Sequence, residues 1–122
     1  MADEISYNSL ITLTNGELTD SYKFSKNLVT QTASGLFKNV WTVGTTEETL
    51  TVSDISTLGI VYLINLDATN YVQIGVSTGV YFCRLKPSAS DIPACFRLEP
   101  GVTIYGKANT SPVKVLVGIY EN

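Results

Sequence analysis

The sequence predicts an all-β protein, an antiparallel β-sandwich resembling a jelly roll with about 8–10 strands. Three observations lead to this fold class. Short runs of alternating apolar residues recur through the chain, and Gly, Pro, Asn and Asp separate them. Fifteen threonines favour strands, because a β-branched side chain packs well on a pleated sheet. Residues 17–32 and 53–57 have room for one helical turn, but we expect no long helix.

Residues 1–32 begin with the clearest local hairpin of the chain. Ile5, Tyr7, Ile11 and Leu13 share one face of a run that ends at Asn15-Gly16. This dipeptide favours a tight hairpin turn, because both residues accept a positive φ. After the turn, Leu18, Tyr22 and Phe24 continue the alternation, although Asp20 interrupts their face. Residues 27–32 fit either a strand or irregular coil.

Two further strands are predicted before residue 53. Residues 36–43 place Phe37, Trp41 and Val43 on one side and Leu36 and Val40 on the other. Apolar residues on both sides predict a strand that is covered on both faces. Leu50 and Val52 then predict a short strand that closes the first half.

The second half repeats one unit, a run of alternating apolar residues followed by a turn. The runs are residues 60–66, 71–76, 80–85, 92–98, 102–105 and 113–119. In the last run Val113, Val115, Val117 and Ile119 face one way, while Leu116 and Tyr120 lie beside Lys114 on the other face. We therefore expect residues 1–122 to form one sandwich domain, in which residues 1–32 serve as an N-terminal arm or attachment segment.

Composition argues against several classes of partner. Only 16% of the residues are charged, against about 25% in an ordinary domain. The net charge is −3 and no basic run occurs, which argues against a nucleic-acid partner. No apolar run approaches the ~20 residues of a membrane span, and the acidic N-terminus does not resemble a secretory signal. We expect synthesis in a host cytoplasm and no membrane partner.

An enzymatic role is not expected. The chain has no histidine, so a Ser-His or Cys-His nucleophile pair cannot form, and neither can the histidine ligands of a cupin-type hydrolase or isomerase. A pair of carboxylates remains possible in principle, but all candidates lie at predicted turns or strand ends, where solvated acids are common: Glu47, Glu48, Asp54, Asp67, Asp91 and Glu99. We predict no catalytic residue and no cofactor.

The two cysteines, Cys83 and Cys95, lie on successive predicted strands, where they could face one another across a hairpin. In a reducing cytoplasm, two small free thiols are the favoured interpretation. Cys95 alternates with Arg97 opposite Phe96 and Leu98, which indicates an exposed thiol. Two thiols without histidine do not make a zinc site, and no metal is expected.

Two other side-chain sets have a structural and a binding interpretation. Asp67 and Asn70 offer oxygen ligands for calcium, but Asp and Asn more often cap their own turn by accepting from backbone amides. The tyrosines suit either core and interface packing or a sugar-stacking platform, and packing is favoured: Tyr7, Tyr22, Tyr62, Tyr71, Tyr81, Tyr105 and Tyr120.

Four segments resemble small β-sandwich proteins in the virions of tailed bacteriophages, namely capsid decoration (cement) proteins and related adaptor or fibre-associated proteins. They are INLDATNYVQIG at residues 64–75, FCRLKP at 82–87, FRLEPG at 96–101 and IYGKAN at 104–109. The resemblance covers roughly residues 45–122 and includes the Asn-Leu-Asp-x-Thr-Asn and Pro-Gly turns. Residues 1–44 match no family that we can name.

The resemblance implies a non-enzymatic virion structural protein on the capsid surface, which stabilises the shell by binding the lattice of the major capsid protein. Surplus apolar surface further suggests self-association, as a homotrimer. The expected lattice contact lies in residues 2–32, with these candidates: Tyr7, Leu10, Lys23, Phe24 and Lys26. The alternative is a tail- or head-fibre or adaptor domain that binds a host receptor or glycan through tyrosines grouped at one end.

Overall fold

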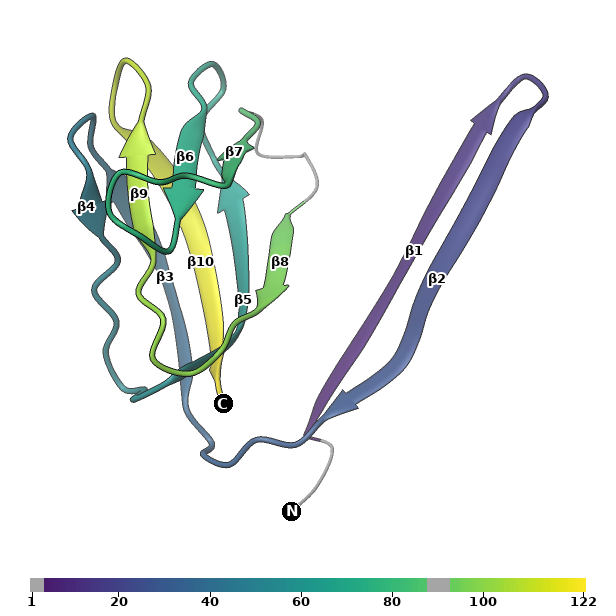
Figure 1. The fold of residues 1–122 in the computed structure, drawn as a ribbon, viewed down its shortest axis with the longest axis horizontal. Coiled ribbons are helices and arrows are strands. Elements are labelled where there is room, and N and C mark those ends of the chain that lie inside the picture. The colour runs from purple at the N-terminus through teal and green to yellow at the C-terminus, as the bar shows by residue number, and fades with distance from the viewer. Residues whose placement is uncertain (1–3, 88–92) are drawn as a thin grey trace. The chain divides into compact units, whose positions relative to one another are not determined.

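The computed structural model describes residues 4–87 and 93–122, apart from the side chains of residues 25–27. In this part of the chain all regular elements are β-strands, ten in number, and the prediction of an all-β fold is confirmed. The chain divides into two compact units, Met1–Thr32 and Ala33–Asn122. The first unit is a hairpin, which we name the arm, and the second is a β-sandwich (Figure 1).

The arm consists of strands β1 (Ile5–Asn15) and β2 (Leu18–Val29), paired antiparallel along their length. The predicted hairpin is present, but its turn is shifted by one residue. Asn15 pairs with Leu18, so the two loop residues are Gly16 and Glu17. Only Gly16 has a positive φ, of 60°, as in turns with glycine at the first central position. Asn15 therefore belongs to the strand.

A β-bulge divides the arm. Tyr7 pairs with Asn27, and the next pair is Ser9 with Phe24, so β2 contains one residue more than β1 in this interval. Such an insertion reverses the faces of all residues beyond it on the longer strand. As a result Val29, which has the opposite parity to Phe24 along β2, joins the same face through its pairing with Ile5.

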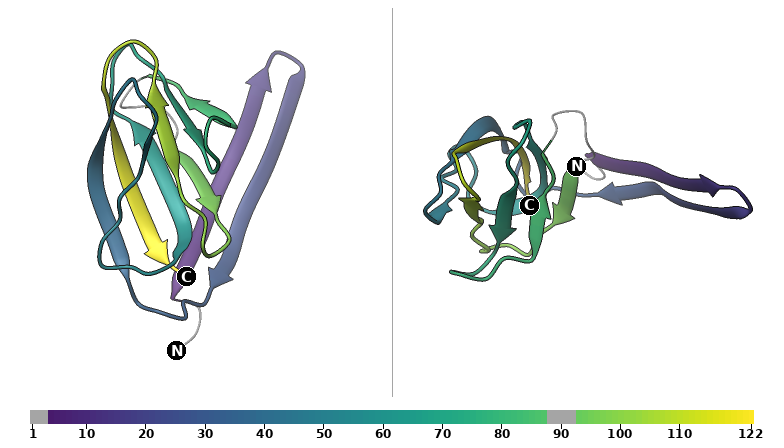
Figure 2. Two further views of the ribbon diagram at one scale, coloured as in Figure 1. Left: turned by 60° about the vertical axis from the view of Figure 1, so that its left-hand side comes forward. Right: turned by 90° about the horizontal axis from the view of Figure 1, so that it is seen from above.

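The sandwich contains two four-stranded antiparallel sheets (Figure 2). One sheet has the order β3-β10-β5-β8 and the other β4-β9-β6-β7. The strands are β3 (Leu36–Val43), β4 (Glu48–Thr49), β5 (Leu58–Asn65), β6 (Val72–Gly75), β7 (Cys83–Leu85), β8 (Ala94–Arg97), β9 (Tyr105–Ala108) and β10 (Val113–Glu121).

This strand order is that of a jelly roll. The first sandwich strand pairs with the last, β3 with β10, and the pairing continues inward as β4 with β9, β5 with β8 and β6 with β7. A long hairpin wound around a barrel gives this pattern, and it places most consecutive strands in opposite sheets. The prediction of an antiparallel sandwich of this type is therefore confirmed.

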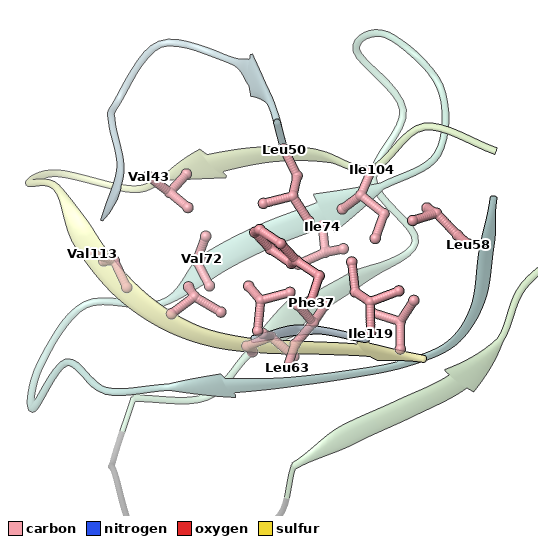
Figure 3. Packing of buried hydrophobic residues seen from close by; sticks show 14 of the residues in the cluster. Phe37, Val43, Leu50, Leu58, Leu63, Val72, Ile74, Ile104, Val113 and Ile119 are labelled. Carbon is pink, nitrogen blue, oxygen red and sulfur yellow. The ribbon is translucent and has the colours of Figure 1, made fainter. Parts of the chain in front are cut away.

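The core lies between the two sheets and is built from alternate residues of each strand (Figure 3). Strand β10 contributes the four residues predicted to share one face, Val113, Val115, Val117 and Ile119, each fully buried. Leu63 of β5, in the same sheet as β10, and Ile74 of β6, in the opposite sheet, belong to the same core. The core is continuous because the opposed inner faces carry only aliphatic and aromatic residues at their centre.

Several predicted strand limits are wrong. Strand β9 begins at Tyr105, where the predicted run 102–105 ends, and β4 comprises Glu48–Thr49 rather than Leu50 and Val52. In both places buried residues precede or follow the ladder: Leu50 donates its N–H to the carbonyl of Ile104 at 2.8 Å, just outside the two paired strands. Burial alone therefore does not mark where β pairing starts. Strand β7 also begins later than predicted, at Cys83.

Two more expectations fail for topological reasons. Strand β3 has the predicted limits, but Leu36 and Val40 are exposed, so only its Phe37 and Val43 side is buried. Cys83 and Cys95 do not face one another across a hairpin, because β7 pairs with β6 in one sheet and β8 pairs with β5 in the other. Both cysteines are free, and Cys95 is exposed as predicted. Part of the predicted turn at residues 86–90, and the first residue of the predicted run 92–98, lie outside the described residues.

Gly75 at the end of β6 supports a first prediction. A Cβ atom at this position would collide with the backbone carbonyl oxygen of Val80, which cannot move without disturbing the following turn. We expect Gly75→Ala to lower the free energy of unfolding by about 2–3 kcal/mol. Chemical denaturation measures this loss, with the exposed Ser77→Ala as control. Equal stability of the two variants would contradict the close approach of these backbones.

Candidate interaction surfaces

The predicted contact residues lie on two different faces of the arm. Tyr7 and Phe24 belong to one face, since their neighbours in the register are the pairs Ile5 with Val29 and Ile11 with Tyr22. Leu10 and Lys23 pair directly with one another, and they therefore lie together on the opposite face. Lys26 is part of β2 at the bulge, but its side chain lies outside the described part of the structure.

One face of the arm is apolar, and we name it the arm face. It carries the cross-strand pairs Ile5 with Val29, Ser9 with Phe24, Ile11 with Tyr22, Leu13 with Asp20 and Asn15 with Leu18, together with Tyr7. The rings of Tyr22 and Phe24 contact one another with centroids 4.5 Å apart. Ile11 is 60% exposed and Leu18 61% exposed, which is unusual for large apolar side chains grouped along one ribbon.

The opposite face of the arm is mostly polar. Thr12 pairs with Ser21 and Thr14 with Thr19, while Leu10, 61% exposed, stands beside Lys23. Near the base of the arm, the backbone N–H of Gln31 donates to Glu4 Oε2 at 3.2 Å. The arm is thus an amphipathic ribbon with its hydroxyl-rich side distinct from its apolar side.

A second apolar surface covers the outside of the β3-β10-β5-β8 sheet, and we name it the outer sheet face. Its centre is formed by residues that alternate with the core positions: Leu36 and Val40 of β3, Leu116 and Tyr120 of β10, and Tyr62 of β5. The Tyr62 ring approaches Gly118, and its centroid lies 6.4 Å from that of Tyr120. The sequence signal for this surface was present in β3 and β10, where both sides are apolar.

The charges around the outer sheet face have one sign. By register and alternation, Lys38, Lys114 and Arg97 project on this side, and the outward positions of the four strands contain no acidic residue. Cys95 lies on the same side, opposite Tyr62. Sequence reasoning missed this uniform sign because these bases come from three strands that only the jelly-roll winding brings into one sheet.

The loop at residues 65–70 adopts the structural rather than the metal-binding arrangement. Asp67 Oδ1 accepts hydrogen bonds from the backbone N–H groups of Asn70, at 2.7 Å, and Thr69, at 2.8 Å. These bonds to Asn70 and Thr69 hold the pKa of the Asp67 carboxyl below its usual value. Asn65 is buried and donates through Nδ2 to the carbonyls of Asn70 and Leu85. Asp67 therefore caps its own turn, as favoured, whereas the side chain of Asn70 instead accepts from Thr110 Oγ1 at 2.8 Å.

Glu47 and Glu48, two of the carboxylates considered as acid–base candidates, each accept hydrogen bonds from donors of the protein itself. Glu47 Oε1 accepts from the Tyr81 hydroxyl at 2.5 Å and from the Gly79 N–H at 2.7 Å. The Tyr81 bond and then the Gly79 bond lower the pKa of Glu47, and the same contact raises the pKa of Tyr81 to about 12. Glu48 accepts from Trp41 Nε1 at 3.0 Å and from the Gly44 N–H at 3.0 Å. Both carboxylates therefore stabilise loops through hydrogen bonds.

Two small depressions lie on the described part of the sandwich. A depression of about 230 Å³ lies between Leu50, Leu58 and Ile104, and another of about 220 Å³ lies beside Trp41 and Phe37. Pockets for small-molecule ligands usually measure about 300–1,000 Å³. Among residues 4–87 and 93–122, no three His, Cys, Asp or Glu residues form a group suited to a metal ion. No helix in this part of the chain is long and apolar enough to cross a membrane.

The tyrosines lie on several elements. Tyr7 and Tyr22 are on the arm, Tyr62 and Tyr120 are on the outer sheet face, and the Tyr71 ring lies beneath the guanidinium of Arg84 at 4.6 Å.

In the comparisons with known proteins, the chain matches no family model, no curated protein and no solved structure. The two apolar surfaces and their charges are therefore the basis for assigning a function.

Proposed function

We propose that this protein is a non-enzymatic virion structural protein, which decorates and stabilises a bacteriophage capsid by binding the lattice of the major capsid protein. The observation that carries the proposal is the arm, a separate two-stranded unit with large exposed apolar side chains. A two-stranded hairpin alone is at best marginally stable in water. An arm of this kind gains stability when a partner surface covers it.

The sandwich supports the same proposal. Jelly rolls recur in viral capsid proteins, although lectins and cupins also use the fold, so the fold alone does not assign a function. The segments that resemble decoration proteins form the β5–β6 turn, with Asp67 as its cap, and parts of strands β6 to β9. Binding through surfaces rather than through a deep pocket suits a protein that covers a preformed lattice in many copies.

In this proposal, the opposite face of the arm contacts the shell. Leu10 is exposed and adjoins Lys23, so the pair offers an apolar contact and a positive charge at one point of the ribbon. Contacts of this type combine desolvation with electrostatic orientation. Tyr7 and Phe24 belong to the arm face.

Co-sedimentation with undecorated capsids tests the proposal. We expect the wild-type chain to pellet with the shells, and the double variant Leu10→Glu with Lys23→Glu to bind at least about tenfold more weakly, because it replaces the contact with two acids. The control, Val80→Glu with Lys107→Glu, makes the same changes at exposed sandwich positions and should bind normally.

Two results would contradict this function. One is a wild-type chain that stays in the supernatant at every shell concentration. The other is full affinity of the Leu10→Glu, Lys23→Glu variant. Saturable binding of the wild-type chain to a host glycan, in the absence of shell binding, would instead favour a fibre or adaptor domain.

A further inference from the structure

The arm face requires an occupant. Its apolar residues run along the whole ribbon, and the arm has no third strand in its own sheet, which is two-stranded. At about 3.4 Å per residue, β1 is about 37 Å long, and two strands about 4.8 Å apart give a ribbon roughly 10 Å wide. The arm therefore presents a strip of about 400 Å² on this face.

The outer sheet face is shorter than the arm, but it can receive most of the length of such a strip. Four strands about 4.8 Å apart span roughly 19 Å, and β3, β5 and β10 are long enough for about 27 Å of sheet. Its apolar side chains are most exposed on the edge strand β3, where Leu36 is 55% exposed and Val40 45% exposed. Face-to-face packing of a ribbon on a sheet with apolar side chains between them is the ordinary sandwich arrangement.

Charge distinguishes between the two ways in which copies of this chain can use these surfaces. If two outer sheet faces met, Lys38, Lys114 and Arg97 of one copy would share an interface with the same three bases of the other. The arm face instead carries an acid, Asp20, opposite Leu13, and Glu17 lies in the adjacent turn. Lys23 projects from the other side of the ribbon. The arm and the outer sheet face are therefore complementary in charge as well as apolar.

We infer that the arm face of one copy docks on the outer sheet face of a second copy, with Asp20 directed at a face whose charged side chains, Lys38, Lys114 and Arg97, are all basic. One such contact covers only about 540 Å² in total, below the roughly 1,200 Å² of a stable interface. Each copy gives one arm and receives one, so two such contacts hold it in the assembly. A closed ring such as the predicted trimer satisfies this exchange, and it leaves Leu10 and Lys23 available on the opposite face.

Disulfide capture with the native Cys95 tests the pairing. Cys95 is exposed on the outer sheet face, so a second thiol on the arm face of another copy should reach it. One chain carries Leu13→Cys with Cys83→Ser and Cys95→Ser, and its partner carries only Cys83→Ser. After mild oxidation of the mixture, we expect a linked pair of chains on a non-reducing gel. Thr12→Cys in place of Leu13→Cys is the matched control on the opposite face, and it should give little of this product.

A charge exchange provides the second measurement, which does not depend on thiol geometry. In sedimentation equilibrium without shells, Asp20→Lys should raise the dissociation constant of the oligomer at least about tenfold. Ser21→Lys, on the opposite face, should not. Adding Lys38→Glu and Lys114→Glu to the Asp20→Lys chain should restore association, and far-ultraviolet circular dichroism checks that each variant retains its strands.

The inference is overturned if the wild-type chain is monomeric at high concentration, or if Asp20→Lys associates like the wild type. It is also overturned if the Leu13→Cys chain gives no more linked product with its partner than the Thr12→Cys chain does. These measurements contain no capsid, so their failure leaves the shell-binding proposal to its own test. Conversely, if copies exchange arms but the chain does not bind shells, only the capsid function is contradicted.

Discussion

Replacing Leu63 with alanine is expected to lower the free energy of unfolding of the sandwich by about 3 kcal/mol. Leu63 is 1% exposed and packs at the centre of the core, between the two sheets. Truncation removes its transfer free energy and leaves a cavity, because Val117 of the neighbouring strand is held by the ladder and cannot fill the space. For a unit of this size, the loss corresponds to roughly 15 °C in melting temperature.

Thermal denaturation of Leu63→Ala and Leu36→Ala compares the two sides of the same sheet. Leu36 is 55% exposed on the outer sheet face, so its truncation should cost less than about 1 kcal/mol in the dissociated chain. Equal losses in the two variants would mean that the side of the sheet facing the second sheet is not the principal core.

The second large effect concerns Glu121 at the end of β10. Its Oε1 accepts from the Gly35 N–H at 3.1 Å, and its Oε2 accepts from the Ser56 N–H at 2.6 Å and from Ser56 Oγ at 2.7 Å. One buried carboxylate thus joins the chain segments that precede β3 and β5 to the last strand. Replacement by glutamine removes the charge and turns one acceptor into a donor that faces other donors.

The bonds from the Ser56 hydroxyl and then from its backbone N–H lower the pKa of Glu121 from 4.5. Because the folded protein binds this proton less readily than the unfolded chain, the carboxylate stabilises the fold above about pH 4.5, and this contribution is lost as the pH falls through the lower folded pKa. Glu47 and Asp67 have lowered pKa values too, and act in the same direction.

We therefore expect Glu121→Gln to melt at least about 5 °C below the wild type at pH 7. This difference should shrink as the pH falls below about 4.5, because the contribution of the wild-type carboxylate is lost over that range. Melting curves between pH 3 and pH 7 provide the measurement, and Glu99→Gln, a change at an exposed turn, is the control. A difference that stays constant over this range would show that the charge of Glu121 is not the cause.

The sequence predicted the local features of the fold well, because alternation is a property of single strands. The β1–β2 hairpin, the limits of β3 and the inward side of β10 follow from period-two patterns that each strand carries by itself. The predicted turn, Asn15-Gly16, lies one residue before the observed turn, Gly16-Glu17, because Asn15 fits both a turn and the end of a strand.

What the sequence could not supply was the identity of each strand's neighbour. In a jelly roll, β7 and β8 are consecutive but belong to different sheets, so the expected meeting of Cys83 and Cys95 does not occur. For the same reason the three bases on the outer sheet face were not recognised as a group. The bulge in β2 is equally hidden, because a single inserted residue leaves the apolar pattern on each side of it intact.

The division of the predicted contact residues between two faces changes how the arm is interpreted. Tyr7 and Phe24 lie with Ile11 and Tyr22, while Leu10 lies with Lys23. An arm with two distinct faces can bind two partners at once, one through apolar packing and one through a mixed contact. In our proposals these partners are a neighbouring copy and the shell, which links assembly of the protein to its attachment.

The winding of the sandwich also determines when the protein can fold during synthesis. Strand β3, the first of its sheet to leave the ribosome, has its ladder partner in β10, the last strand of the sandwich. Such distant pairing makes folding slow compared with that of locally paired proteins. Strand β10 must therefore be synthesised before the sheet can close, and until then the nascent chain carries an unpaired apolar strand that chaperones are expected to protect.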